Sequence, residues 1–386
     1  MQTVPVILAG GIGERFWPLS RSSSPKQLHA IASERSMLEE TLFRMRACCP
    51  NGASPLIVAG AAIAGKIADT LGAADTYARI LNGRDGGAAA RMGTLASMET
   101  DVDIIAEPQG KNTAPAIALA AAFIKAKHGD AVMAVASADH AISPDGAFEQ
   151  ALNRAANLAV GQGGLVVFGV KPSRPETGYG YIEVGERLTD DGECPAFKVK
   201  RFVEKPNAAD AAAFMESGRF LWNSGMFVWK ASAILEAFEK YMPDLHGQAL
   251  AAANKGFTEE AISGFYSECP KESIDYGIME KADGVSAVCG AFSWDDLGSW
   301  EALSRLLGSD GAGTTVDGAA AYASGCAGSL IVNKSSGLAL AAIGLKDVAL
   351  IAVDDAVLAI DRSRLPDLKK YLAEIKESGK FPADLF

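Results

Sequence analysis

Short apolar runs alternate with helical patterns along the first 170 residues of the chain. Each run has the length and composition expected of a buried strand. We predict strands at residues 4–9, 55–60, 103–106, 131–136 and 165–169, and helices at residues 36–47, 61–71 and 116–127. This alternation predicts an α/β fold with a Rossmann-like, mostly parallel mixed sheet and helices on both faces.

The pattern changes after residue 170. We predict β-rich segments at residues 175–183 and 198–205, a helix from Asn207 to about Gly218, and helices over residues 231–270. From about residue 312, short β runs at residues 329–332, 338–343, 348–353 and 357–360 precede a predicted terminal helix at residues 365–378. Residues 72–100 have little pattern, and we expect a variable surface region there.

The composition is that of an ordinary globular protein, with 386 residues, 49% hydrophobic and 22% charged. This length suffices for one large domain and a smaller one. The formal net charge of -11 argues against nucleic-acid binding, although a local cationic pocket for a nucleotide remains compatible with it. No run is long enough to span a membrane, and no signal-peptide layout is seen. The six cysteines lack metal-ligand spacing and predict free thiols in the cytoplasm.

A glycine turn follows the first predicted strand, which ends at Ala9. The backbone N–H groups of Gly10, Gly11 and Gly13 can approach a ligand closely, and Arg15, Arg21 and Lys26 follow. Glycines followed by fixed cations suit a polyphosphate, whereas a turn with solvated charges is the alternative. The stretch lacks the Lys-Ser or Lys-Thr of a P-loop and has Phe16 where a dinucleotide fingerprint needs glycine or alanine.

Two further polar segments lie beside predicted strands and helices. Residues 107–115 place polar side chains between two prolines before a helix, where they either meet a ligand or only cap the helix. Asp139 follows the strand at residues 131–136, a position at which open α/β sheets bind ligands, although a simple turn cap is the alternative.

Residues 6–27 closely resemble the signature of the sugar-nucleotide pyrophosphorylases, L-x-G-G-x-G-x-R-x-x-P-L-(S)-R-x-x-x-P-K. The pair Ser20-Arg21 and the run Pro25-Lys26-Gln27 are most similar to the mannose-1-phosphate guanylyltransferase branch. Further blocks of the family follow in order: E-P-x-x-[RK]-N-T-A-P-A from residue 107, A-D-H from 138, P-x-T-G-Y-G-Y-I from 175, F-x-E-K-P from 202, W-N-S-G-M-F from 222 and W-x-D-[VL]-G-S-W from 294.

The resemblance implies a nucleotide-diphospho-sugar transferase fold with a catalytic domain at residues 1–305. A small β-helix-like domain with a terminal helix would occupy residues 306–386. In this family such a tail often makes dimer contacts, so we expect a homodimer. We expect no nucleic-acid or membrane partners. Longer members carry a cupin domain with phosphomannose isomerase activity, which has no counterpart here, and we expect no isomerase activity.

The resemblance also implies a role for individual residues. Arg15 and Lys26 would be catalytic, and Asp139 and Asp296 would bind Mg²⁺, with Asp295 the weaker candidate. Asp139 and Asp296 are 157 positions apart (296 − 139), and spacing alone does not bring them together. The expected nucleotide-binding residues are Ala9, Gly10, Gly11, Gly13, Glu107, Asn112 and Thr113. The expected sugar-phosphate-binding residues are Gly178, Glu204, Lys205 and Asn223.

The leading hypothesis is therefore the formation of GDP-mannose and pyrophosphate from GTP and mannose 1-phosphate. The same chemistry with another nucleotide or another hexose 1-phosphate is one alternative. A non-catalytic sugar-nucleotide sensor is the other. Neighbouring residues on a strand point to opposite sides, so Glu204 and Lys205 can share a site only if a turn or bulge redirects one of them.

Overall fold

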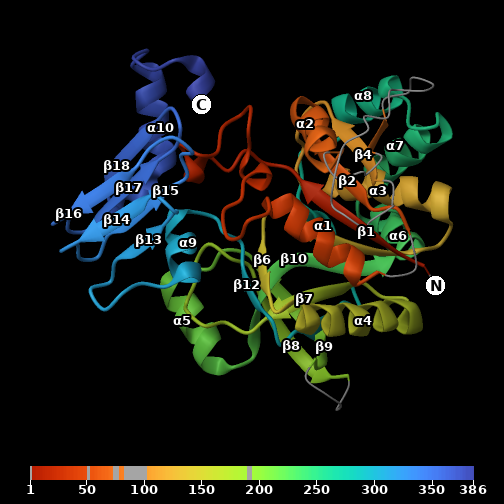
Figure 1. Cartoon of the computed structure of the whole chain (residues 1–386). Helices are drawn as coiled ribbons and strands as arrows, with labels where there is room; N and C mark the ends of the chain where they lie inside the picture. Colours follow the sequence, from red (N-terminus) through yellow and green to blue (C-terminus); the bar gives the residue numbers. More distant parts are fainter. Residues whose placement is uncertain (1, 50–52, 73–77, 82–101, 189–193) are drawn as a thin grey trace. The chain divides into compact units, whose positions relative to one another are not determined.

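The computed structural model describes residues 2–49, 53–72, 78–81, 102–188 and 194–386 (Figure 1). Most of the predicted surface region at residues 72–100 lies outside these ranges. Two compact units are present. Unit 1 comprises Met1–Gly10, Glu39–Ala138 and Ile142–Trp294, and unit 2 comprises Gly11–Leu38, Asp139–Ala141 and Asp295–Phe386. The ranges of the two units alternate along the chain, so no single position in the sequence divides them. The catalytic role of residues 1–305 remains a prediction.

A ten-stranded sheet runs through unit 1, with strand order β3-β4-β2-β1-β5-β10-β7-β11-β9-β8. The strands β3, β4, β2, β1 and β5 pair in parallel, whereas β10 is antiparallel to both β5 and β7. The sheet is therefore mixed. Its strands are β1 (Thr3–Ala9), β2 (Leu56–Gly60), β3 (Ala78–Leu81), β4 (Val102–Glu107), β5 (Val132–Ser137), β7 (Val166–Val170), β8 (Tyr181–Arg187), β9 (Ala196–Val203), β10 (Phe220–Lys230) and β11 (Ser286–Cys289).

Helices cover both faces of this sheet. In β5, successive side chains point to opposite faces and nearly all are buried, so both faces must be covered. Val132 and Ala134 pack with Phe148 of one helix layer, whereas Met133 and Val135 pack with the other layer. The Ala-rich α3 is buried on all sides from Ala114 to Ile124, which is typical of a helix enclosed within a core. The helices are α1 (Met37–Ala47), α2 (Ala61–Gly72), α3 (Thr113–His128), α4 (Asp145–Gln162), α5 (Ala208–Ser217), α6 (Ala231–Tyr241), α7 (Pro243–Asn254) and α8 (Glu259–Glu268).

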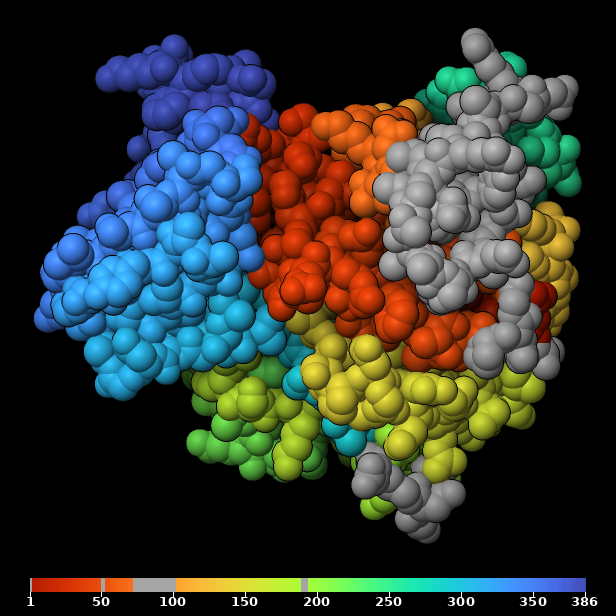
Figure 2. Space-filling model, in the orientation of Figure 1, coloured from red at the N-terminus to blue at the C-terminus, as the bar shows by residue number. Residues whose placement is uncertain are grey.

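The C-terminal part of unit 2 is β-rich and forms one continuous block of surface (Figure 2, blue). Within it β13, β15 and β17 pair in parallel, as do β14 and β16, and β18 is antiparallel to β17. The elements are α9 (Trp300–Leu307), β13 (Thr315–Asp317), β14 (Ala321–Ser324), β15 (Leu330–Asn333), β16 (Leu340–Ile343), β17 (Val348–Ala352), β18 (Val357–Asp361) and α10 (Leu368–Glu377). A two-stranded sheet joins β6 (Ala141–Ser143) to β12 (Ser293–Asp295).

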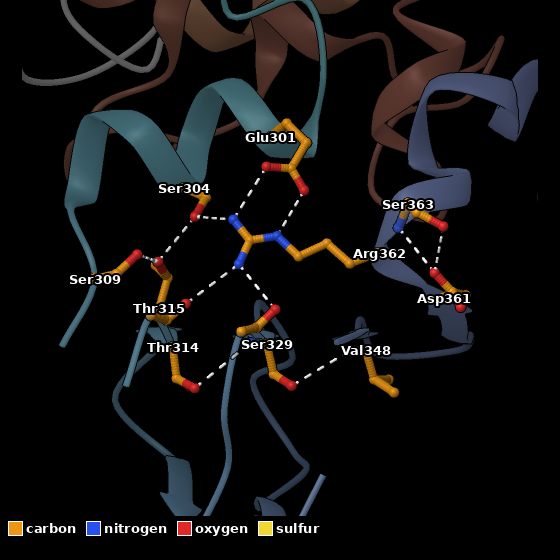
Figure 3. A network of polar contacts seen from close by, with 12 residues as sticks. Glu301, Ser304, Ser309, Thr314, Thr315, Ser329, Val348, Asp361, Arg362 and Ser363 are labelled. Atoms are coloured by element: carbon orange, nitrogen blue, oxygen red, sulfur yellow. Dashed lines mark hydrogen bonds and ion pairs between the residues drawn. The ribbon is translucent and has the colours of Figure 1, made fainter. Parts of the chain in front are cut away.

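A partly buried arginine connects α9 to these strands (Figure 3). Arg362 donates to both carboxylate oxygens of Glu301, at 2.7 and 3.0 Å, and to the hydroxyl of Ser304 at 2.8 Å. It also donates to the backbone oxygens of Gly313 and Gly328. Because the guanidinium is planar and has five N–H groups, one side chain can satisfy all these acceptors and hold the helix on the strands.

The core of unit 2 includes residues from the glycine-turn segment. Phe16 and Trp17 are buried together with Trp300, and the rings of Phe16 and Trp300 lie 4.8 Å apart. The indole of Trp300 donates to the backbone oxygen of Trp17 at 3.0 Å. The segment that carries the glycines is therefore packed against α9 and the β-rich region.

Most predicted elements are confirmed, with ends shifted by a few residues. The terminal helix α10 begins at Leu368 instead of residue 365, because Pro366 lies in a preceding short 3₁₀ segment (Arg362–Asp367). The elements that were not predicted include the long strand β10 and the helices α4 and α9. All six cysteines are free thiols, as expected. No helix in the described ranges is both long and apolar enough to cross a membrane.

Candidate active site

Backbone conformation explains why glycines follow β1. Gly11 and Gly13 have φ angles of 85° and 76°, in the left-handed region that favours glycine. A Cβ at Gly13 would lie 2.6 Å from the Cβ of Lys26, so the turn can approach the Lys26 segment only without a side chain. Gly10 and Gly11 are exposed, and a Cβ on either would meet nothing within 4 Å.

Lys26 lies at the centre of a polar group that we call the Lys26 cluster: Lys26, Asp139, Asp296 and Leu297. Its ammonium donates to Oδ2 of Asp139 at 2.8 Å and to the backbone oxygens of Asp296 and Leu297 at 3.0 and 2.9 Å. The side chain is buried, on a 3₁₀ turn (Lys26–Leu28). Three segments far apart in the sequence thus meet at one cation.

The two backbone oxygens are presented by an unusual turn after β12. Leu297 has a φ of 43°, and the N–H of Gly298 donates to Oδ1 of Asp296 at 3.0 Å. Asp295 has a different role, because it accepts from the N–H of Leu297 at 2.9 Å and pairs with Arg305 at 3.0 Å. Asp295 therefore shapes the turn, whereas Asp296 joins the Lys26 cluster through its backbone oxygen.

The charges around Asp139 favour its ionised form. Burial alone would raise the pKa of this carboxyl, but the charges of Lys26 and His140 and the hydrogen bond from Lys26 lower it overall. Nε2 of His140 lies 4.0 Å from Oδ1 of Asp139, so His140, expected to be structural, borders the cluster. Burial, the largest influence on this imidazole, lowers its pKa.

The donor chemistry of the cluster fits Mg²⁺. Carboxylate oxygens are hard ligands, and Mg²⁺ in phosphate-processing sites is commonly held by one or two carboxylates, with substrate phosphates and water completing its shell. The described residues contain no group of three or more acidic, histidine or cysteine side chains suited to a metal. Metal binding by Asp139 and Asp296 remains a prediction.

The two arginines of the glycine-turn segment differ. Arg15 is exposed on a 3₁₀ turn (Glu14–Phe16), and no hydrogen bond or ion pair joins it to another described residue. Arg21 forms a two-pronged contact with the Asp355 carboxylate, one arm of which is 2.8 Å long, and donates to the backbone oxygen of Pro18. Arg21 therefore connects the segment to the β-rich region, and we do not expect it to contact a phosphate.

In unit 1, the loop before α3 is bound to the segment at residues 272–274. Asn112, with a φ of 71°, caps the helix by accepting from the N–H of Thr113 at 2.8 Å. The Thr113 hydroxyl accepts from the N–H of Ile274 at 2.8 Å. Glu107 is buried and accepts from the hydroxyl of Tyr266 at 2.8 Å, and burial raises its pKa. Nucleotide binding by these three predicted residues remains a prediction.

A second polar group, the Asn223 cluster, comprises Gly180, Glu204, Lys205, Asn223 and Asp275. Asn223 on β10 donates through Nδ2 to Oδ1 of Asp275 at 2.8 Å, and its N–H donates to the Gly180 oxygen at 2.8 Å. A Cβ at Gly180 would lie 2.5 Å from Oε2 of Glu204. Burial, the nearby Glu204 and the nearby Glu280 raise the pKa of Asp275 to about 6, against the effect of the Asn223 hydrogen bond.

Glu204 and Lys205 can share a site, because the backbone turns at Lys205. Lys205 has a φ of 44°, which redirects its side chain, and its ammonium forms an ion pair with Oε1 of Glu204. Among described residues other than glycine, positive φ angles occur at Asn112, Lys205 and Leu297, and also at Phe257 and Asp347. Strained backbone of this kind is concentrated at functional sites. Of these residues, Lys205 belongs to the Asn223 cluster and Leu297 to the Lys26 cluster.

Sequence reasoning missed two members of the Asn223 cluster. It selected Gly178, whose N–H donates to Glu176 at 3.1 Å, whereas the glycine against Glu204 and Asn223 is Gly180. Asp275 was not selected either. No local pattern distinguishes these residues, since the contact with Asn223 joins positions 52 apart in the sequence.

Comparison with known proteins gives a consistent result. The sequence model of the nucleotidyl transferase family matches residues 4–309. A mannose-1-phosphate guanylyltransferase of Escherichia coli is 36% identical over 382 residues, which are 98% of this chain and 74% of that protein. The xanthan biosynthesis protein XanB of Xanthomonas campestris pv. campestris is 36% identical over 386 residues, with coverage of 98% and 74%.

A solved structure extends the likeness to three dimensions. The crystal structure of a mannose-1-phosphate geranyltransferase from Thermus thermophilus matches with a TM-score of 0.79 and 28% identity. The match covers 97% of this chain and 100% of that one. The likeness therefore includes the β-rich C-terminal region as well as the α/β part.

Proposed function

The chain belongs to the nucleotidyl transferase family, and on that premise we propose that it makes GDP-mannose and pyrophosphate from GTP and α-D-mannose 1-phosphate. A phosphate oxygen of the sugar phosphate attacks the α-phosphorus of GTP, and the bond to the β-phosphate breaks as pyrophosphate leaves. The attacking oxygen is already ionised at pH 7, so no general base is required. The protein then supplies alignment and charge neutralisation.

The observation that carries this proposal is the Lys26 cluster. A buried ammonium that contacts the ionised Asp139 carboxylate and the backbone oxygen of Asp296 is a preorganised charge arrangement, and such arrangements stabilise the charge that develops in phosphoryl transfer. Lys26 and Arg15 would neutralise the phosphates of GTP. The N–H groups of Gly10, Gly11 and Gly13, which follow Ala9, would bind the same phosphates.

Mg²⁺ is the proposed cofactor. Bound to Asp139 and Asp296, it would supply positive charge at the reacting phosphates. Lys26 would hold the Asp139 carboxylate in place through the 2.8 Å contact.

The residues of unit 1 are proposed to bind the rest of the two substrates. Lys205 would meet the sugar phosphate, and Glu204, Asn223 and a glycine of the segment at residues 178–180 would meet sugar hydroxyls. The Glu107, Asn112 and Thr113 segment would lie on the guanine side. We also propose a β-helix-like arrangement for the parallel C-terminal strands, a homodimer and a cytoplasmic location.

Pyrophosphate release from the purified protein tests the proposal. The assay combines Mg²⁺ and mannose 1-phosphate with GTP, ATP, UTP or dTTP in parallel, with EDTA added to matched samples. We expect release with GTP alone, abolished by EDTA. Release with another nucleotide, or only with another hexose 1-phosphate, would overturn the substrate assignment, and no release with any pair would overturn the enzymatic assignment.

A matched pair of variants completes the test. Lys26→Met removes the buried ammonium, whereas Lys369→Met removes an ammonium that is 72% exposed in the same unit and pairs with Glu14. We expect loss of release for the first variant and normal release for the second.

A further inference from the structure

Asp275 occupies a fixed position in unit 1. It begins a π-helical turn (Asp275–Met279), a rare element that is frequent at functional sites. The N–H of Ile274 donates to the Thr113 hydroxyl at 2.8 Å, and the N–H of Ala114 donates to the oxygen of Glu272 at 3.0 Å. The carboxylate of Asp275 is therefore presented by a segment that is bound to the first turn of α3.

The contacts of Asn223 determine which way its amide faces. The N–H of Gly225 can only donate, and it lies 3.1 Å from Oδ1 of Asn223. The carboxylate of Asp275 accepts, and it lies 2.8 Å from Nδ2. If the amide were rotated by 180°, its Nδ2 donor would face the N–H donor of Gly225, and its Oδ1 acceptor would face the acceptor carboxylate of Asp275. Only one orientation of the Asn223 amide satisfies both neighbours.

Asp275 is the member of this pair whose removal would release the amide. The Gly225 contact comes from the same strand, two residues away, and adjusts with it. The Asp275 contact comes from a separate element and is 52 residues distant in the sequence. Without this acceptor, the amide could adopt orientations that present oxygen where nitrogen now lies.

Orientation matters for recognising a sugar. Beyond its contacts with Asp275 and Gly225, the amide of Asn223 retains one N–H donor and one acceptor lone pair, and neighbouring Glu204 offers only acceptors when ionised. A site built of such groups distinguishes hydroxyl positions, because a misplaced hydroxyl leaves polar groups unpaired. A rotated amide would reverse the donor and acceptor pattern and weaken that distinction.

We propose that Asp275 is a positioning residue for hexose recognition, which acts by fixing the orientation of the Asn223 amide beside Glu204 and Gly180. This inference rests on the proposed function, since it requires that the Asn223 cluster binds the hexose. Asp275 should therefore affect the binding of the sugar phosphate and leave the binding of the nucleotide unchanged.

The test measures KM for each substrate in Asp275→Ala, Asp275→Asn, Asn223→Ala and the Asp275→Ala/Asn223→Ala double variant. We expect Asp275→Ala to raise KM for mannose 1-phosphate by about tenfold, with KM for GTP unchanged, since one hydrogen bond is removed. The preference for mannose 1-phosphate over glucose 1-phosphate should fall as well. Asp275→Asn retains an acceptor and should stay within about threefold of the parent protein.

The double variant separates positioning from a general structural role. If Asp275 acts through Asn223, the double variant should be no worse than Asn223→Ala by more than about twofold. Additive losses, or equal increases in KM for both substrates, would overturn the inference. Asp283→Asn is the control, because it removes a carboxylate that is 93% exposed eight positions away in the sequence.

Binding measurements keep this inference distinct from the proposed function. Calorimetry with mannose 1-phosphate alone needs no turnover, and folding of each variant is checked by thermal melting. If the parent protein binds mannose 1-phosphate but releases no pyrophosphate, the proposed function fails, and tenfold weaker binding by Asp275→Ala would still support the inference. Equal binding by folded Asp275→Ala and the parent protein would overturn it.

Discussion

Two lysines proposed to act in the same reaction lie in opposite environments. The Lys26 side chain is 5% exposed and is held by three acceptors, whereas the Lys205 side chain is 63% exposed and is held by Glu204. A buried ammonium requires partners, because an unpaired charge away from water is very costly. An exposed ammonium keeps its water and can reorient. Lys26 is thus part of the fold of unit 2, whereas Lys205 is an adjustable contact on unit 1.

The comparison predicts its largest effect at Lys26. Lys26→Met should lower turnover by roughly 10²–10³, by analogy with the loss of one preorganised donor. The protein should also lose roughly 2–3 kcal/mol of unfolding free energy, because Asp139 and two backbone oxygens lose their shared donor. Steady-state rates and urea unfolding measure the two effects. Unchanged stability would show that the cluster does not support the fold of unit 2.

A smaller effect is expected at Gly180. In Gly180→Ala, the new Cβ would occupy a position 2.5 Å from Oε2 of Glu204, so the flexible carboxylate must move. Displacing a substrate-binding group by this much should lower kcat/KM by up to about 10²-fold, with little change in melting temperature. Gly178→Ala is the matched variant, since its Cβ would lie 3.3 Å from Glu176. A larger loss for Gly178→Ala would reverse our preference for Gly180.

Substitution of Lys205 should have a smaller effect on activity than substitution of Lys26 or Gly180. Lys205→Met removes one charge-assisted contact to the sugar phosphate, and we expect kcat/KM to fall by about tenfold. Stability should stay within about 1 kcal/mol, because exposed ion pairs contribute little. A stability loss as large as that of Lys26→Met would remove the contrast between the two lysines.

The last prediction concerns only the pH dependence of stability at Asp275. Burial and the neighbouring Glu204 and Glu280, opposed by the Asn223 hydrogen bond and the nearby Lys205, raise its pKa from 3.8 to about 6. Between these values the folded protein binds more protons than the unfolded chain, so this carboxyl lowers stability as the pH rises through that window. The penalty is complete above about pH 6 and is at most about 3 kcal/mol.

Asp275→Asn removes this penalty. We expect the variant to match the parent protein near pH 4 and to melt at a higher temperature at pH 7–8, when the two are compared by calorimetry. An advantage that is independent of pH would show that the charge of Asp275 is not its cause.

Much of the fold could be predicted because its signals are local. Apolar runs identified β1, β2, β4, β5 and β7 within a few residues. The helix predicted at residues 36–47 corresponds to α1. By contrast, β10 was missed because its apolar run carries Asn223, Ser224 and Gly225, which interrupt a strand pattern.

The candidate site was predictable residue by residue but not as a group. The motifs selected Lys26, Asp139 and Asp296, and the structure places them in one cluster. They did not select Asp275 or Gly180, because both gain their meaning from contacts with Glu204 or Asn223. They also did not indicate that Arg21 would be paired with Asp355.

The sequence by itself determined most of the alternating strands and helices of the first 170 residues, the glycine turn after β1 and the identity of the charged and amide side chains. These follow from local periodicity, backbone preference and side-chain chemistry. Tertiary structure alone decided that Gly11–Leu38 folds with Asp295–Phe386, and that Lys26 meets Asp139 and Asp296. It also decided the left-handed backbone at Lys205 and Leu297. The physical reason is that such contacts depend on which distant segments pack together, and no short stretch of sequence carries that information.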